Sequence, residues 1–298
     1  MNSGRHGAPT TPIPDADDTV ITQPPTHLAV WGDPIEHSRS PQLHAAAYRV
    51  LGVDWQYGRQ QVSAEGFSEA LQACDGSWRG LSLTMPLKEV AYRAAHWLDE
   101  HSRLTGATNT LLLSADGKHR GFNTDIAGLV AALREGSVAS VSSVRVLGVG
   151  ATAASAVVAA RELGADRVFF VARQPHKATA VIDVADRLGV RSSVTTFDDD
   201  CGAVDLTIST IPSASVLAHD TAQRLADAGG VLFDVAYSPW PSALAQQWNA
   251  QHPVLSGLGM LLHQAVRQVR IFYHGEPDVP VPTEDDVVAA MRCALMGD

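Results

Sequence analysis

The stretch 144–161, VRVLGVGATAASAVVAAR, constrains the fold of this chain more than any other part of the sequence. Its first apolar residues predict a short buried strand, Gly148 and Gly150 predict a tight turn, and the small residues at 151–163 predict a helix that can lie close to a sheet. This layout places backbone N–H groups and the positive end of a helix against a pyrophosphate. The pattern, G-x-G-x-x-A, favours a dinucleotide-binding unit, although ordinary strand–helix turns also contain it.

Strands and helices continue to alternate after this turn. We expect strands at 166–171, 192–196, 204–209 and 231–235, a short strand near Val254, and helices at 178–188 and 242–249. Such alternation predicts a doubly wound parallel sheet, in which ligands bind beyond the carboxyl ends of the strands. Gly148, Arg173, Thr210 and Val235 end or follow these strands. Their expected convergence on one edge of the sheet supports the nucleotide-binding interpretation.

The end of the second strand in this unit indicates which dinucleotide binds. NAD-binding domains carry an acidic residue near this point, where it takes the ribose 2′-hydroxyl. Here the strand ends in Ala172, Arg173 and Gln174, with Lys177 close behind and no acid among them. Arg173 and Lys177 are suited to a 2′-phosphate. We therefore predict NADP, with an ordinary surface arginine as the alternative interpretation of Arg173.

The first part of the chain predicts a second α/β unit. Its expected strands lie at 27–31, 55–62, 79–84, 111–113 and 119–122, and its expected helices at 42–51, 64–73, 89–97 and 125–134. The nucleotide unit is already complete before Gly257. Helix 261–273 and the last helix of the chain are therefore expected to pack back on the first unit.

These patterns divide the chain into three parts. Residues 1–25 are rich in Pro, Thr, Asp and Gly and predict a disordered extension. Residues 26–134 are expected to form one α/β domain, which residues 257–298 complete. Residues 135–256 begin with a stretch of small residues and are expected to form the domain with the doubly wound parallel sheet.

Several polar residues stand where local structure does not fully account for them. Ser38 and Ser40 lie two residues apart in an expected loop, where both hydroxyls can face one carboxylate or polyol. Ser40 precedes Pro41, so a helix N-cap is the alternative for it. Gln264 lies four residues after Met260 on one helix face, where packing explains the methionine more easily than the glutamine.

Lys88 and Asp125 are the two charged residues that attract a chemical interpretation. Lys88 begins the helix expected at 89–97, where the positive helix end disfavours a lysine. It is either a solvated surface lysine or, if partly buried, a candidate base. Asp125 begins another helix, where a carboxylate is stabilising in any case. Asn109 lies in an expected turn, and asparagine is common in turns for structural reasons alone.

Six blocks of the sequence resemble the shikimate dehydrogenase family, in its actinobacterial branch. They are GDPIEHSRSPQLH (32–44), GLSLTMPLKE (80–89), GATNT (106–110), GFNTD (121–125), FDVAYSPWPSAL (233–244) and SGLGMLLHQA (256–265). The blocks occur in the family's order and span essentially residues 27–298. Each block alone is weakly specific, whereas the ordered set is highly specific.

The resemblance implies that residues 26–134 with 257–298 form a substrate-binding catalytic domain and that residues 135–256 form an NADP-binding Rossmann domain. It implies reversible NADPH-dependent reduction of 3-dehydroshikimate to shikimate, with Lys88 as acid/base paired with Asp125. It implies that Ser38 and Ser40 hold the substrate carboxylate. The other implied substrate residues are Thr84, Asn109 and Gln264 at the ring hydroxyls, and Tyr237 at the pocket wall. Together with the glycine turn, it gives as cofactor residues Gly148, Gly150, Ala151, Thr152, Ala153, Arg173, Lys177, Thr210, Val235, Gly257 and Met260.

The departures from the family pattern all lie on the cofactor side. Ala151 replaces a second consecutive glycine, Ala172-Arg173-Gln174 replaces Asn-Arg-Thr, and Ser209-Thr210-Ile211-Pro212 replaces Asn-Ala-Thr-Ser. Two alternatives therefore stay open. One is an NAD-dependent quinate/shikimate dehydrogenase; those relatives tend to carry an acid after the second strand and threonine for the second serine, and this chain has neither feature. The other is a non-catalytic shikimate-binding paralogue.

Composition excludes several other classes of protein. The net charge of −10 without a basic block argues against nucleic acid, and no apolar run is long enough to span a bilayer. Cys74, Cys201 and Cys293 lie far apart, which argues against a disulfide framework or a metal site. We expect a cytoplasmic protein that binds a small-molecule substrate, as a monomer or homodimer.

Overall fold

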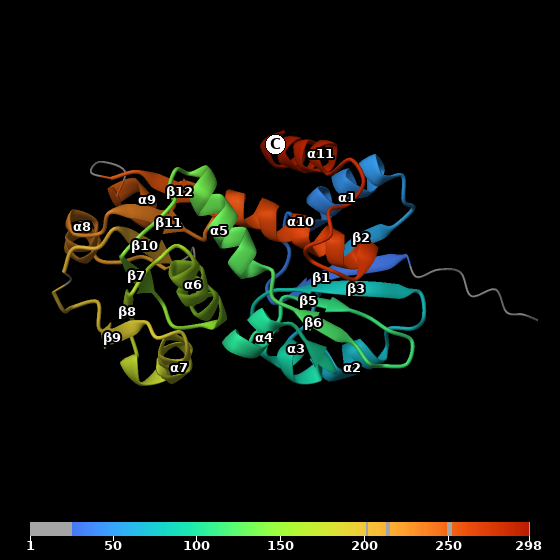
Figure 1. Ribbon diagram of the computed structural model, residues 1–298, viewed down its shortest axis with the longest axis horizontal. Coiled ribbons are helices and arrows are strands. Elements are labelled where there is room, and N and C mark those ends of the chain that lie inside the picture. The colour runs from blue at the N-terminus through green and yellow to red at the C-terminus, as the bar shows by residue number, and fades with distance from the viewer. Residues whose placement is uncertain (1–25, 201, 213–214, 249–251, 298) are drawn as a thin grey trace, which may run out of the picture.

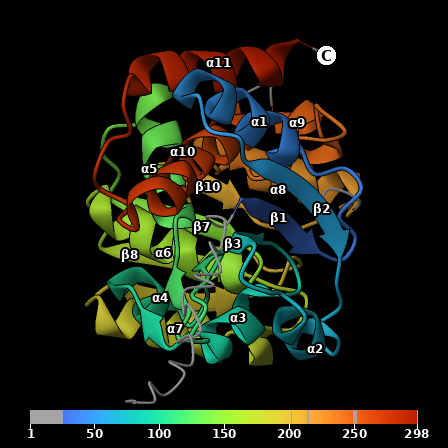
Figure 2. The ribbon, with the colours of Figure 1, turned by 90° about the vertical axis from the view of Figure 1, so that its right-hand side faces the viewer.

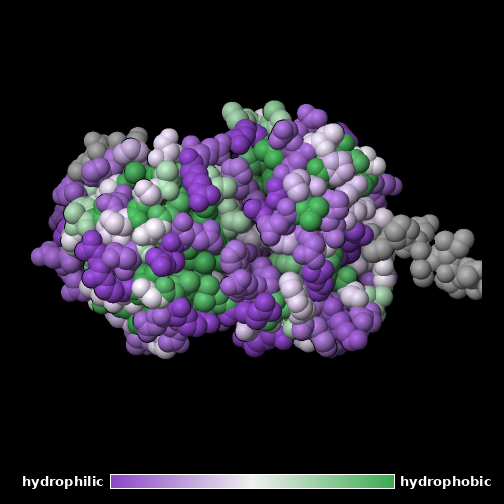
Figure 3. Space-filling view, in the orientation of Figure 1, coloured by the Kyte–Doolittle hydropathy of each residue, from purple (hydrophilic) through white to green (hydrophobic). Residues whose placement is uncertain are grey.

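The computed structural model describes residues 26–297 apart from 201, 213–214 and 249–251. The extension predicted at 1–25 and Cys201 therefore lie outside the described residues. Two six-stranded sheets stand side by side, and helices cover both of them (Figure 1). No helix of the described ranges combines the length and apolarity needed to cross a membrane. Polar residues are spread over both halves of the face in Figure 3, with apolar residues in small groups between them.

The first sheet has the strand order β2-β1-β3-β5-β6-β4. Its strands are β1 (His27–Gly32), β2 (Gln56–Gln61), β3 (Trp78–Leu83), β4 (Trp97–Leu98), β5 (Thr110–Leu112) and β6 (Arg120–Phe122). Strands β1, β2 and β3 are parallel, while β5 pairs antiparallel with β3 and β6, so the strands predicted at 111–113 and 119–122 form a hairpin. Strand β4 was not predicted: the helix expected at 89–97 ends at Ala94, and β4 then pairs with β6.

Helices cover the two faces of this sheet. They are α1 (Ser40–Leu51), α2 (Phe67–Gln72), α3 (Lys88–Ala94), α4 (Glu100–Thr105), α10 (Leu258–His274) and α11 (Glu284–Met296). Side chains alternate along β1, so Leu28 packs with α1, α10 and α11, whereas Ala29 and Trp31 pack with α2 and α3. Figures 1 and 2 both place α11 along α1, which confirms that the C-terminal helices return to the first sheet.

The second sheet is entirely parallel, in the order β12-β11-β10-β7-β8-β9. Its strands are β7 (Ser143–Leu147), β8 (Arg167–Val171), β9 (Arg191–Thr195), β10 (Leu206–Ser209), β11 (Val231–Asp234) and β12 (Val254–Ser256). Counted along the chain, this is the 3-2-1-4-5-6 order of a Rossmann fold. The order reverses between β7 and β10, so a ligand-binding crevice is expected there. The predicted doubly wound sheet is confirmed.

Helices pack on both faces of the second sheet. They are α5 (Asp125–Glu135), α6 (Ala151–Glu162), the 3₁₀ turn η1 (Pro175–Lys177), α7 (Thr179–Arg187), α8 (His219–Asp227) and α9 (Ala243–Trp248). Val144 and Val146 of β7 pack with α5, α6 and α7, and Leu147 packs with α8 and α9. Helix α8 was not predicted. Its last turn is held by the buried Arg145 guanidinium, which donates to the carbonyl oxygens of Leu225 and Ala228.

Candidate active site

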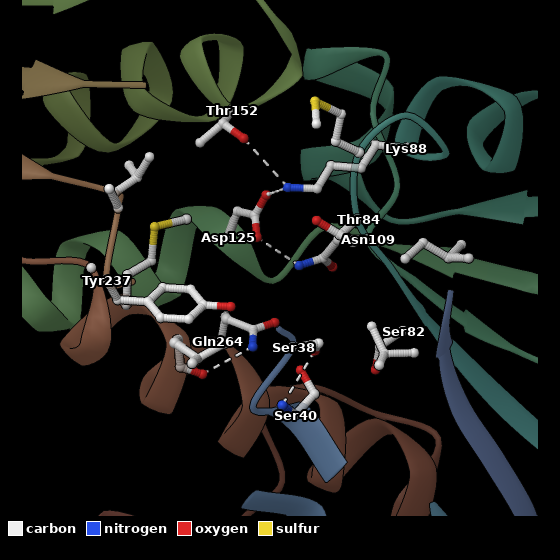
Figure 4. Close-up of a pocket in the computed structure, with 18 of the residues that line it drawn as sticks. Ser38, Ser40, Ser82, Thr84, Lys88, Asn109, Asp125, Thr152, Tyr237 and Gln264 are labelled. Carbon is white, nitrogen blue, oxygen red and sulfur yellow. Dashed lines mark hydrogen bonds and ion pairs between the residues drawn. The ribbon is translucent and has the colours of Figure 1, made fainter. Parts of the chain in front are cut away.

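A cavity of about 420 Å³ lies between the two sheets. Its walls come from loops after β1 and β3, from α5 and α10, and from the ends of β10 and β11 (Figure 4). The predicted site residues that line it are Ser38, Ser40, Thr84, Lys88, Asn109, Asp125, Thr152, Thr210, Val235, Tyr237, Gly257, Met260 and Gln264. The predicted residues outside its lining are Gly148, Gly150, Ala151, Ala153, Arg173 and Lys177.

Lys88 and Asp125 form a close ion pair at this cavity. The two residues begin α3 and α5, and Lys88 Nζ lies 2.5 Å from Asp125 Oδ2. Their side chains are only 13% and 6% exposed, so water screens the pair weakly. Lys88 Nζ also lies 3.4 Å from Thr152 Oγ1, at the start of α6 on the nucleotide side. Lys88 is therefore not a solvated surface lysine.

Asn109 holds the Asp125 carboxylate in place. Its Nδ2 donates to Asp125 Oδ1 at 2.8 Å and to Thr124 Oγ1 at 2.9 Å. Its Oδ1 accepts hydrogen bonds from Thr124 N and Thr110 Oγ1. Thr124 occupies the N-cap position of α5 but makes no side-chain cap bond. The Asn109 amide therefore lines the cavity while it is hydrogen-bonded to other residues of the protein.

Ser38, Ser40 and Tyr237 gather at another part of the cavity (Figure 4). The N-cap interpretation of Ser40 is wrong, because Ser40 is the first residue of α1 and Arg39 takes the cap position without a side-chain cap bond. The Ser40 hydroxyl is thereby left to the cavity. Burial raises the pKa of Tyr237, so its hydroxyl stays protonated and can donate a hydrogen bond.

The buried polar residues Ser82 and Gln268 also line the cavity, although neither was predicted as a site residue. Ser82 Oγ donates to Gln268 Oε1 at 2.8 Å. Gln268 Nε2 donates to Thr110 Oγ1 at 3.0 Å and to the Asn109 carbonyl at 3.2 Å. One signal was available in the sequence, because Gln268 continues the helix face of Met260 and Gln264 by another four residues.

His44 lies fully buried behind Gln268. Its Nε2 is 3.3 Å from Gln268 Oε1 and its Nδ1 is 2.9 Å from the Tyr48 hydroxyl. Because an amide oxygen can only accept, Nε2 carries the proton and Nδ1 accepts from Tyr48. Burial lowers the pKa of His44 from 6.5 to about 3, so the imidazole is neutral in the folded protein.

We expect the free energy of unfolding to fall on acidification from pH 6.5 to 4.5. In this range the unfolded chain protonates His44 and the folded chain does not, so stability rises with pH and is lost as pH falls toward 3. One such proton corresponds to at most about 1.4 kcal/mol per pH unit. Urea unfolding of wild type and His44→Gln at both pH values gives, for each protein, the slope of the unfolding free energy against pH. The difference between the two slopes measures the contribution of His44. Equal slopes would refute the assignment of a neutral buried imidazole.

The end of β7 fits a nucleotide phosphate. Gly148 has a φ of 105°, and a Cβ there would lie 2.6 Å from Thr210 Oγ1 across the β7–β10 crevice. Gly150 is the N-cap of α6, with no side-chain cap bond and open space around its Cα. The first N–H groups of α6 are therefore available to an anion. Ala151 and Ala153 belong to the same helix, and Ala153 packs in the core beneath it.

The remaining predicted cofactor residues lie around this crevice. Arg173 and Lys177 are exposed beyond the end of β8, with Lys177 in η1. Gly257 lies against β11, where a Cβ would stand 2.1 Å from the Val235 carbonyl oxygen, so close packing requires glycine there. Met260 lines the cavity from the first turn of α10. Within the described ranges, no group of three or more His, Cys, Asp or Glu is arranged to hold a metal ion.

A Rossmann sheet with an open helix end, next to a cavity of hydroxyls and a Lys–Asp pair, defines a dinucleotide-dependent oxidoreductase that acts on an alcohol or ketone. The family model described as shikimate dehydrogenase substrate binding domain matches residues 30–111. The chain belongs to the shikimate dehydrogenase family. It is 33% identical to the Shikimate dehydrogenase (NADP(+)) of Methanothermobacter thermautotrophicus over 268 residues, which cover 86% of this chain and 94% of that protein.

Solved structures agree with this membership. The shikimate dehydrogenase of Mycobacterium tuberculosis superposes with a TM-score of 0.80 at 39% identity, covering 92% of this chain and 100% of that chain. The shikimate 5-dehydrogenase of Thermus thermophilus, in complex with NADP(H) and shikimate, gives a TM-score of 0.73 at 28% identity, covering 90% and 99%. The recognition of the family from the ordered sequence blocks is confirmed.

Proposed function

We propose that this chain catalyses the reversible NADPH-dependent reduction of 3-dehydroshikimate to shikimate. The observation that carries the proposal is the buried Lys88–Asp125 pair, placed between the hydroxyl-lined cavity and the open end of α6. Relatives at 33% and 34% identity are named Shikimate dehydrogenase (NADP(+)), and they support both the substrate and the cofactor. We place substrate binding in residues 26–134 and 257–298, and nucleotide binding in residues 135–256.

The chemistry divides between cofactor and protein. A bound nicotinamide supplies or accepts a hydride at the substrate carbon. In the reduction, the Lys88 ammonium donates a proton to the oxygen that becomes a hydroxyl, and in the oxidation the neutral amine accepts it. Asp125 orients Nζ and balances its charge, and Asn109 fixes the Asp125 carboxylate. Lys88 and Asp125 thus act as a unit at the reacting hydroxyl.

The cofactor and the substrate have separate sets of proposed ligands. For NADP, the backbone from Gly148 to Ala153 would hold the pyrophosphate, and the exposed Arg173 and Lys177 would hold the 2′-phosphate. Thr152, Thr210, Val235, Gly257 and Met260 line the cavity and would border the nicotinamide. For the substrate, Ser38, Ser40 and Tyr237 hold the carboxylate end, and Thr84, Asn109 and Gln264 border the ring hydroxyls.

We place the enzyme in the cytoplasm, as a monomer or homodimer.

The proposal is tested by following NADPH absorbance with purified protein, shikimate and NADP⁺, with NAD⁺ and quinate in parallel reactions. Turnover that is rapid only with shikimate and NADP⁺ is the expected result. Turnover with NAD⁺ and quinate would move the function to quinate/shikimate dehydrogenase. Binding of shikimate by calorimetry without any turnover would identify a non-catalytic paralogue instead.

A further inference from the structure

Thr110 is a buried residue that the proposed mechanism does not use. It is the first residue of β5, it is fully buried, and it lies outside the lining of the cavity. Its Oγ1 lies 2.8 Å from Asn109 Oδ1 and 3.0 Å from Gln268 Nε2. Thr110 therefore links the buried glutamine of α10 to the asparagine that bonds to Asp125.

Main-chain groups fix the orientation of the two side-chain amides on either side of Thr110. The Thr124 N–H can only donate, so the Asn109 atom 2.9 Å from it is the oxygen Oδ1. The Asn109 carbonyl oxygen can only accept, so the Gln268 atom 3.2 Å from it is the nitrogen Nε2. Neither amide can be reversed without the loss of one of these hydrogen bonds.

The direction of the Thr110 hydroxyl follows from these two amides. Gln268 Nε2 donates to Thr110 Oγ1, and Asn109 Oδ1 can only accept, so the Thr110 proton points to Asn109. Gln268 is held from its other side, because its Oε1 accepts from Ser82 Oγ at 2.8 Å. Asn109 Nδ2 continues the chain of hydrogen bonds to Asp125 Oδ1 at 2.8 Å. All the bonds from Gln268 to the carboxylate therefore run in one direction, an arrangement in which each bond polarises the next.

The two oxygens of the Asp125 carboxylate have different partners, with Asn109 at Oδ1 and Lys88 at Oδ2 (Figure 4). A rotation of the Asn109 amide would break the bond at Oδ1 and let the carboxylate turn away from Lys88 Nζ. The Thr110 hydroxyl and the Thr124 N–H both donate to Asn109 Oδ1 and oppose this rotation.

We propose that Thr110 is a positioning residue for the Lys88–Asp125 pair and acts through Asn109. Its hydroxyl keeps the Asn109 amide turned so that Nδ2 faces the carboxylate, and the carboxylate in turn holds Lys88 Nζ at the cavity. This inference rests on the proposed function, because it takes the pair as the acid/base of the reaction.

Thr110→Val replaces the hydroxyl by a methyl group of similar size. Gln268 Nε2 keeps the Asn109 carbonyl and Asn109 Oδ1 keeps the Thr124 N–H, so both amides retain a partner and the variant should fold. We expect kcat for shikimate oxidation to fall about tenfold, the effect of about one hydrogen bond on the transition state. The KM for shikimate should change much less, because the proposed ligands of the carboxylate end are untouched.

Two further variants at Thr110 separate the loss of the hydroxyl from a change in packing. Thr110→Ser keeps the hydroxyl and should restore most of the wild-type kcat. Thr110→Ala removes the hydroxyl without adding a methyl group and should lower kcat as Thr110→Val does. A serine variant as slow as the valine variant would overturn the inference.

Thr108→Val is the matched control. Thr108 is equally buried two residues earlier, and its Oγ1 donates to Ser102 Oγ at 3.1 Å, away from Asn109. This variant should lower the unfolding temperature about as much as Thr110→Val and leave kcat near that of wild type. A similar loss of kcat in both variants, or no loss in Thr110→Val, would contradict a positioning role.

Hydrogen exchange of the Asn109 side-chain amide, followed by NMR, measures the effect without turnover. Its Nδ2 protons bond to Asp125 Oδ1 and Thr124 Oγ1 and should exchange faster in Thr110→Val than in wild type. Faster exchange in the variant, without shikimate turnover by wild type, would keep the hold of Thr110 on Asn109 and reject the proposed enzyme. Turnover by wild type, with exchange and kcat unchanged in the variant, would reject the role of Thr110 alone.

Discussion

Replacing Lys88 by alanine is expected to lower kcat for shikimate oxidation by about 10²–10⁴-fold, the usual contribution of a positioned acid/base. The side chain is only 13% exposed and its Nζ lies 2.5 Å from Asp125 Oδ2, so water cannot readily take over its proton transfer. The KM for shikimate should change much less, because Ser38, Ser40 and Tyr237 are untouched. Steady-state kinetics with both substrates saturating gives kcat, and calorimetry gives the Kd.

The matched control is Lys118→Ala. Lys118 lies in the turn between β5 and β6 and is 67% exposed, next to Asp116. This variant loses the same charge far from the cavity and should retain the wild-type kcat. A kcat for Lys88→Ala comparable to that of wild type would remove Lys88 from acid/base catalysis. Unfolding measurements on both variants ensure that the folded proteins are compared.

Arg173→Ala is expected to raise the KM for NADP⁺ about 10- to 100-fold and to leave the KM for NAD⁺ nearly unchanged. The guanidinium is exposed beyond the end of β8, where it is available for charge-assisted bonds to a 2′-phosphate that NAD⁺ lacks. Each factor of ten corresponds to about 1.4 kcal/mol of binding free energy. Initial rates over a range of each cofactor measure the change.

Arg191→Ala serves as the control for this variant. Arg191 is an exposed arginine of the neighbouring strand β9 and pairs with Asp166 at 2.6 Å, at the opposite end of the strand from the crevice. Its loss should leave both KM values near those of wild type. Equal increases for NADP⁺ and NAD⁺ in Arg173→Ala would show that Arg173 acts on the fold or on a part common to both cofactors.

The sequence predicted the fold in those elements whose residues carry a strong periodic pattern. The glycine turn at Gly148 and the parallel strands around it were predicted, because buried β-strands and a tight turn have local signatures. Strand β4 was missed because it has two residues and depends on its pairing with β6. Helix α8 was missed because it buries only Ala222, Leu225 and Ala226, a small apolar set after the turn at Pro212.

The candidate site was predictable where a residue conflicts with its local structure. A lysine at the start of a helix is such a conflict, and Lys88 was identified for that reason. Its partner, 37 residues away, follows only from the tertiary fold or the family resemblance. Ser82 and Gln268 show no local conflict. Their place at the site depends on hydrogen bonds between separate elements, which one sequence does not display.

The most direct test of the proposed reaction follows a labelled hydride. The protein is incubated with 3-dehydroshikimate and NADPH that carries two deuterium atoms at C4 of the nicotinamide, and the product is examined by NMR. We expect shikimate with one deuterium on the carbon that bears the new hydroxyl. Unlabelled shikimate, or no shikimate at all, would rule out the proposed hydride transfer.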